Sequence, residues 1–89
     1  MTVRYTKEFI TQLKKQNVRI RKSLKKAIDL FLEDPNNSAL DNHKLHGIWK
    51  GFKSIDVTSD WRAIYQEIKE GEGSIAYFTA LGTHKQLYK

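Results

Sequence analysis

Apolar residues in the first half of the chain recur at helical spacing. Residues 2–5 form a short strand-like segment, after which Thr6 can cap a helix that has its apolar residues on one stripe, Phe9, Ile10 and Leu13. Beyond Asn17, a second apolar stripe advances in steps of three and four and comprises Ile20, Leu24, Ala27, Ile28, Phe31 and Leu32. The pattern predicts two amphipathic helices, and Asp34-Pro35 ends the second because the residue before proline avoids helical geometry.

The second half of the chain has the pattern of β-strands. Three runs rich in aromatic and branched residues cover 52–57, 61–68 and 74–81. Because only short breaks separate them, at Ser59-Asp60 and at 70–73, we expect antiparallel hairpins. The sequence therefore predicts an α+β fold in which a strand and two helices precede a three-strand antiparallel meander, with both helices packed on one face of the sheet.

The orientation of Arg62 depends on the first of these hairpins. A two-residue loop at Ser59-Asp60 places Val57 opposite Arg62 and Ile55 opposite Ile64, so that Arg62 shares a face with apolar side chains. A bulge or a longer loop would instead free Arg62 from them.

Length and composition narrow the class of protein. A chain of 89 residues is expected to form a single domain over 1–89, because it is too short for two hydrophobic cores. It has no cysteine, so neither disulfides nor thiolate ligation of a metal can add stability, and we expect a cytoplasmic protein. Neither a secretory signal nor an apolar stretch of membrane-spanning length is present, so no membrane association is expected.

The charge of the chain favours a polyanionic partner. Sixteen basic residues against ten acidic ones leave a formal net charge of +6, for which RNA, DNA and an acidic protein are all suitable partners. Seven basic residues follow one another with no acidic residue between them: Lys14, Lys15, Arg19, Arg21, Lys22, Lys25 and Lys26. They are either a footprint for a phosphate backbone or the solvated face of the two helices.

Three segments of the chain carry a resemblance to a known family. They are residues 43–57 (HKLHGIWKGFKSIDV), 60–65 (DWRAIY) and 81–88 (LGTHKQLY). In this order and spacing they resemble the central and closing motifs of the RelE/StbE superfamily toxins, and of their YafQ-like members in particular. The resemblance implies a RelE/ParE-like fold and a ribosome-dependent endoribonuclease, an mRNA interferase of a type II toxin–antitoxin system. It also implies a cognate antitoxin as partner, with operator DNA bound only through the antitoxin complex.

RNA cleavage without a metal needs a base, an acid and donors for the charge that grows on the phosphate. Imidazole suits the proton transfers because it exchanges protons near neutrality, and fixed cations suit the phosphate. By the resemblance, His43, Asp60, His84 and Tyr88 fall on positions used for catalysis or substrate placement, and Arg62 on the arginine that would hold the scissile phosphate. Asp56 stands where many YafQ-like members have a histidine, so either the base is a carboxylate here or the proton transfer runs through His43 and Asp60.

A second group of residues is predicted to bind the RNA. Lys50 and Lys53 flank Trp49 and Phe52, an interleaving of cations and rings typical of surfaces where bases stack and phosphates pair. Lys53 also matches a basic position of RelE-like members. The predicted RNA-binding set is Lys53, Lys50, Lys44, Trp49 and Lys85.

Each assignment has a structural alternative. Gly82 and Thr83 can simply cap a final helical turn beside a surface His84, and Trp49 can be a packing residue, as Trp61 is expected to be. A metal site formed by the three histidines, His43, His46 and His84, lacks a carboxylate or thiolate at any recognised ligand spacing. We therefore expect neither a metal nor another cofactor.

Two departures from the family pattern leave other functions open. Besides Asp56, the chain has Ala80 where many members have an arginine, a loss for which Lys85 or Arg62 would have to compensate. A weakly active or inactive toxin retained as an antitoxin-bound co-repressor is one alternative. A ParE-like toxin that poisons DNA gyrase is the other, although it has no need of the His43 and His84 pair.

Overall fold

Two helices follow the first strand, as predicted. A computed structural model of the chain describes residues 1–88, and in it α1 spans Lys7–Lys14 and α2 spans Val18–Glu33. Both helices have side-chain N-caps: Thr6 Oγ1 accepts from the backbone N–H of Phe9 at 3.2 Å, and Asn17 Oδ1 accepts from that of Ile20 at 3.0 Å. Asn17 thus separates the two helices by starting the second.

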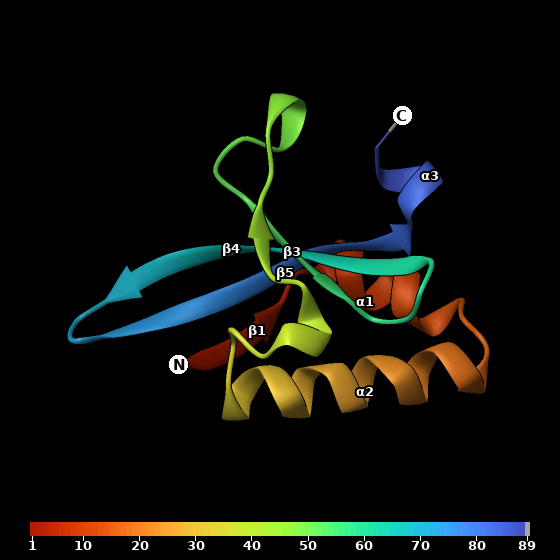
Figure 1. The fold of residues 1–89 in the computed structure, drawn as a ribbon, viewed down its shortest axis with the longest axis horizontal. Coiled ribbons are helices and arrows are strands. Elements are labelled where there is room, and N and C mark those ends of the chain that lie inside the picture. The colour runs from red at the N-terminus through yellow and green to blue at the C-terminus, as the bar shows by residue number, and fades with distance from the viewer. Residues whose placement is uncertain (89) are drawn as a thin grey trace.

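Five strands form one mixed sheet in the order β1-β5-β4-β3-β2 (Figure 1). Their bounds are β1 Thr2–Tyr5, β2 His43–Lys44, β3 Lys53–Asp56, β4 Trp61–Glu70 and β5 Gly73–Thr83. The last three strands are the predicted antiparallel meander, and the α+β fold is confirmed. β1 pairs with β5 in parallel, and the two-residue β2 extends the sheet beyond β3. The sequence pattern did not reveal β2, because two residues are too few for an alternation to be recognised.

Three short helical segments complete the chain. They are η1 Ser38–Leu40, η2 Gly47–Trp49 and α3 His84–Leu87. The first two were not predicted, whereas α3 is the final helical turn that the sequence offered as the alternative for Gly82 and Thr83. Within residues 1–88, no helix combines the length and apolar composition needed to cross a membrane.

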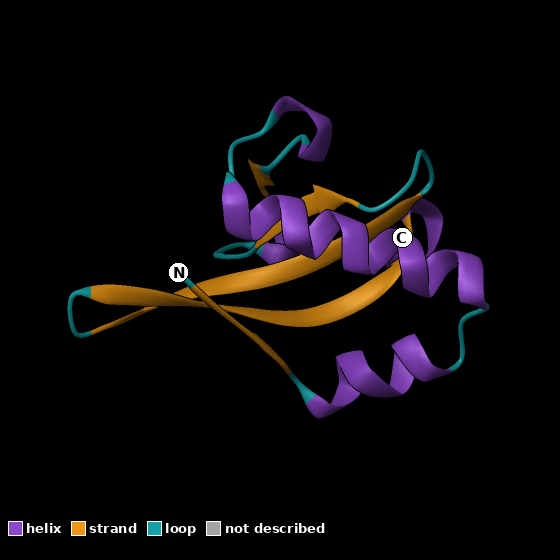
Figure 2. Ribbon diagram, turned by 90° about the horizontal axis from the view of Figure 1, so that it is seen from below, coloured by secondary structure: helices purple, strands orange, loops and turns teal. Residues whose placement is uncertain are grey.

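The hydrophobic core lies between the sheet and the two long helices, which pack on one face as predicted (Figure 2). Phe31 of α2 makes edge-to-face contacts with Tyr65 and Phe78, at ring-centroid distances of 5.0 and 5.5 Å. Phe9 of α1 joins this cluster 5.9 Å from Phe78. In contrast, α3 and the β2–β3 connection project from the side of the sheet opposite α2 (Figure 1).

The β3–β4 hairpin has the longer loop, one of the two possibilities that the sequence left open. Residues 57–60 connect the strands, and the backbone N–H groups of Val57 and Thr58 both donate to the carbonyl of Trp61, at 2.9 and 3.2 Å. The strand partner of Arg62 is therefore Asp56, and not Val57 as a two-residue loop would require. The extra loop residue turns Arg62 to the face away from the core, because neighbouring residues of a strand point to opposite faces.

Candidate active site

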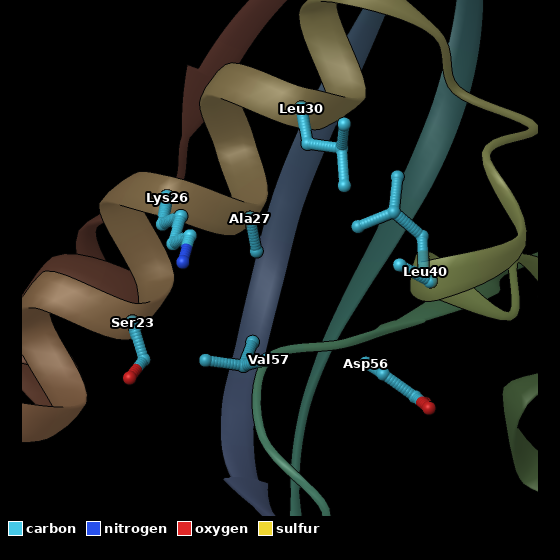
Figure 3. Close-up of a pocket in the computed structure, with 8 residues that line it drawn as sticks. Ser23, Lys26, Ala27, Leu30, Leu40, Asp56 and Val57 are labelled. Atoms are coloured by element: carbon cyan, nitrogen blue, oxygen red, sulfur yellow. The ribbon is translucent and has the colours of Figure 1, made fainter.

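Polar side chains gather on the face of the sheet that the long helices leave open. Register pairs His43 with Ser54, Ser54 with Ile64, and Asp56 with Arg62. Paired residues of an antiparallel sheet share a face, so the side chains of His43, Ser54, Asp56 and Arg62 lie on the same one. Figure 3 shows the alternation at the end of β3, where Val57 points toward α2 and Asp56 points away from it.

The C-terminal helix α3 folds back over this open face at Gly82. A Cβ added at Gly82 would lie 3.0 Å from Gln86 Oε1 and 3.3 Å from two side-chain carbons of Leu87, so glycine is what permits the close approach. Thr83 caps α3 in a capping box with Gln86, and the backbone N–H of His84 donates to the carbonyl of Asp60 at 2.9 Å. The Gly-Thr-His segment thus caps a helical turn and also places His84 beside the β3–β4 loop.

Two side-chain hydrogen bonds attach the end of α3 to the rest of the site. Trp49 Nε1 donates to the carbonyl of Leu87 at 3.0 Å, and the Tyr88 hydroxyl donates to Ser54 Oγ at 3.0 Å. Ser54 is fully buried, so its hydroxyl is a fixed acceptor. The exposed imidazole of His84 lies against Tyr88, with 4.6 Å between the ring centroids. His43 and His84 therefore reach the same surface, one as the strand partner of Ser54 and the other through Tyr88.

Asp41 orients the imidazole of His43. Nδ1 of His43 lies 2.7 Å from the carbonyl oxygen of Asp41 and 3.8 Å from its Oδ2. A carbonyl oxygen can only accept, so Nδ1 carries the hydrogen and the neutral ring keeps its lone pair on Nε2. Asp41 itself has a left-handed backbone with φ +46°, a conformation that aspartate tolerates better than most residues. Sequence reasoning missed Asp41, although an Asp two residues before a candidate histidine was the available signal.

Asp56 and Arg62 form a half-buried ion pair at the same face. Asp56 Oδ1 lies 3.0 Å from Arg62 Nε, but no N–H points at this oxygen, so the contact is electrostatic and lacks the geometry of a hydrogen bond. Burial raises the pKa of Asp56, an effect that Arg62 and His43 oppose and Asp41 reinforces. Arg62 also donates through one terminal nitrogen to three backbone carbonyls, those of Thr58, Ser59 and Trp61. The N–H groups of this nitrogen are therefore used in holding the loop.

The predicted RNA-binding residues do not all share this face. Lys44 is the strand partner of Lys53, and Lys53 that of Tyr65, so both lysines lie on the face of the core residue Tyr65. Lys53 there pairs with Glu67 at 3.1 Å. Lys50 is exposed in the β2–β3 connection and Lys85 is exposed on α3.

The two predicted tryptophans have structural roles. Trp49 is half-buried, packs edge-to-face on Phe52 and anchors α3, and Trp61 packs against the core as expected.

Asp60 is exposed, and within residues 1–88 its carboxylate makes neither a hydrogen bond nor an ion pair. Across the same part of the chain, no three His, Asp or Glu side chains come together in a group that could hold a metal ion.

Comparison with known proteins assigns the chain to a family. Residues 1–89 match the family described as the bacterial toxin of type II toxin–antitoxin systems, YafQ. The chain belongs to the YafQ family of toxins. No curated protein sequence matches it.

Solved structures of similar toxins share the fold. YafQ from E. coli strain BL21(DE3) is 24% identical over 98% of this chain and 97% of its own, with a TM-score of 0.77. A YoeB/ParE toxin from Agrobacterium tumefaciens is 16% identical over 94% and 99%, with a TM-score of 0.75. YafQ in the E. coli DinJ–YafQ complex is 23% identical over 98% and 97%, with a TM-score of 0.62. At these identities the likeness shows the fold alone.

Proposed function

We propose that this YafQ-family toxin is a ribosome-dependent endoribonuclease that cleaves mRNA by acid–base chemistry of its own side chains. The observation that carries the proposal is that Ser54 is the strand partner of His43 and also accepts a hydrogen bond from Tyr88, the residue against which His84 lies. The two imidazoles are exposed and come from segments about forty residues apart in the chain. An RNA phosphate between them would meet a proton acceptor and a proton donor.

In the proposed reaction His43 is the general base. Its Nε2 takes the proton of the 2′-hydroxyl, the 2′-oxygen bonds to phosphorus, and the bond from phosphorus to the 5′-oxygen breaks. The products are a 2′,3′-cyclic phosphate and a 5′-hydroxyl, and His84 supplies the proton that the departing 5′-oxygen needs. The Asp41 carbonyl fixes the tautomer that this role requires, and its carboxylate, 3.8 Å from Nδ1, stabilises the imidazolium as it forms.

Four other predicted residues support the reaction. Tyr88 positions His84 and presents a ring for base stacking, while Asp56 steadies both Arg62 and the charge on His43. Lys85 is exposed and directly follows the proposed acid, and Arg62 lies on the same sheet face as His43; these two cations take the place of the arginine that many members have at position 80. Because Arg62 already serves three loop carbonyls, we expect a slower enzyme than a member that has both arginines.

We further propose an antitoxin as the protein partner, as in the DinJ–YafQ complex of the E. coli relative. A net charge of +6 favours an acidic segment, and the exposed basic side of α2 or the open sheet edge offers it a surface. Operator DNA would then be bound through the antitoxin, and the ribosome would supply the mRNA in an orientation that the toxin alone does not impose.

The test is translation of a defined mRNA with purified ribosomes, followed by primer extension and analysis of the cut ends. Wild-type protein is expected to leave a 2′,3′-cyclic phosphate, and His84→Gln or His43→Gln to lower the rate by about 10²-fold or more, the usual size of a general acid–base contribution. Lys22→Gln on the outer side of α2 is the control and should cleave normally. Wild-type rates in both histidine variants would refute the mechanism, and inhibited gyrase with intact transcripts would favour the ParE-like alternative.

A further inference from the structure

Residues 43–53, which comprise β2, the β2–β3 connection and the first residue of β3, line an open cavity that the proposed reaction does not use. We call this projecting segment the finger (Figure 1). The cavity has a volume of about 350 Å³, with Leu45 and Phe52 as its apolar lining and Lys44, His46, Lys50 and Lys53 as its polar lining. The backbone N–H of Leu45 donates to the carbonyl of Phe52 at 2.9 Å, so the finger is a closed hairpin with a defined shape.

The charges around this cavity are poorly balanced. Lys44 and Lys53 are direct strand partners, an arrangement of like charges that destabilises a sheet. Glu67 neutralises Lys53 alone, and within the described residues 1–88 neither Lys44 nor Lys50 forms an ion pair. Three lysines therefore line the cavity, and one carboxylate is paired with them. An anion in the cavity would relieve this repulsion.

Two lysines of the cavity, Lys44 and Lys53, and the candidate active site lie on opposite faces at the same edge of the sheet. His43 and Lys44 are neighbours in β2 and point to opposite sides, as do Ser54 and Lys53 in β3. β2 is the edge strand and has only two residues, so a flexible strand of RNA can pass around it from one face to the other.

From this placement we propose that the finger cavity is a second phosphate site, which holds a backbone phosphate of the RNA strand away from the bond that is cut. The inference rests on the proposed ribonuclease function and extends it. The lysines bind the phosphate, and Leu45 and Phe52 provide an apolar wall against which the attached nucleoside packs. The site would hold the strand in register while His43 and His84 act on its neighbouring linkage.

The experiment measures binding of a fully 2′-O-methylated single-stranded RNA, which lacks the attacking hydroxyl, by fluorescence anisotropy over a range of salt concentrations. Each phosphate contact contributes about 0.7 to the slope of log K against log salt for a single strand. Because the cavity holds one phosphate, Lys44→Gln/Lys50→Gln should reduce the slope by about 0.7. The control, Lys22→Gln/Lys26→Gln on α2, removes the same charge and should leave the slope unchanged.

Several results would overturn the inference. The first is an equal fall in slope for both pairs, which would indicate binding by net charge alone. The other two are an unchanged slope for the finger pair and no measurable RNA binding by the wild type at low salt. Inorganic phosphate is titrated in parallel and followed by amide NMR shifts of the finger. Shifts from free phosphate with no effect of the finger pair on RNA would exclude an RNA strand as the source of the anion. Weaker antitoxin binding by the finger pair, with unchanged RNA binding, would assign the cavity to an acidic peptide.

The two proposals can fail separately. A wild-type protein that cleaves mRNA, with equal slopes in the two lysine pairs, would retain the ribonuclease function and remove the finger site. A wild-type protein that shows the difference between the pairs but never cleaves would do the reverse.

Discussion

Gly82→Ala tests whether the site depends on α3 lying against the sheet. The new methyl group would stand 3.0 Å from Gln86 Oε1 and 3.3 Å from Leu87 Cγ and Cδ2. Gln86 can move, but its Oε1 accepts from the backbone N–H of Thr83 at 2.9 Å, so movement weakens the capping box. Leu87 must change its rotamer or shift its backbone, and a backbone shift would draw its carbonyl away from Trp49.

Overpacking of this kind costs about 1–3 kcal/mol, whereas replacing glycine in a strand returns about 0.5–1 kcal/mol through the unfolded state. Gly73→Ala is the matched control because its nearest atom, the Glu70 carbonyl oxygen, would be 3.8 Å away, an ordinary contact. The control is expected to be neutral or slightly stabilising. The difference between the two variants in free energy of unfolding, about 1–3 kcal/mol, then measures the clash alone.

Two assays report the outcome. Urea unfolding gives the free-energy difference, and the NMR signal of the Trp49 indole N–H reports whether its bond to Leu87 persists. If α3 leaves the sheet, His84 and Tyr88 leave with it, so mRNA cleavage should fall about tenfold or more, as expected when 1.4 kcal/mol or more is lost from the active arrangement. A Gly82→Ala protein with the stability, indole signal and cleavage rate of Gly73→Ala would refute the reasoning.

Three further outcomes are expected. Ser54→Ala and Tyr88→Phe should each lose about 1 kcal/mol of stability and the double variant little more, since one hydrogen bond joins them; additive losses in a double-mutant cycle by urea unfolding would contradict this. Trp49→Phe keeps the ring but removes the donor to Leu87, so backbone amides of α3 should exchange faster with deuterium while those of α2 stay unchanged. Burial raises the pKa of Asp56 above its unfolded value, so the stabilisation from this carboxyl group is complete below the unfolded pKa and is lost as the pH rises through the folded pKa. Between about pH 3 and 7, the free energy of unfolding of the wild type should therefore fall relative to that of Asp56→Asn as the pH rises. Parallel curves for the two proteins would be inconsistent with a raised pKa.

Local pattern alone determined most of the secondary structure. The apolar stripes predicted α1 and α2, and Thr6 and Asn17 lie where side-chain caps satisfy free backbone N–H groups. The runs of branched and aromatic residues gave the three long strands. The motifs of residues 43–57, 60–65 and 81–88 were sufficient for the family, because a family resemblance needs only residue order and spacing.

Only the tertiary structure decided which side chains meet. One additional loop residue placed Arg62 opposite Asp56, and a two-residue edge strand set His43 on one face and Lys44 on the other. Side chains alternate along a strand, so a register that differs by a single residue reverses every assignment to a face, and neither composition nor periodicity fixes that register. The position of α3 likewise depends on a contact across the sheet, in which Leu87 lies against a glycine and Tyr88 reaches a serine in a strand more than thirty residues earlier.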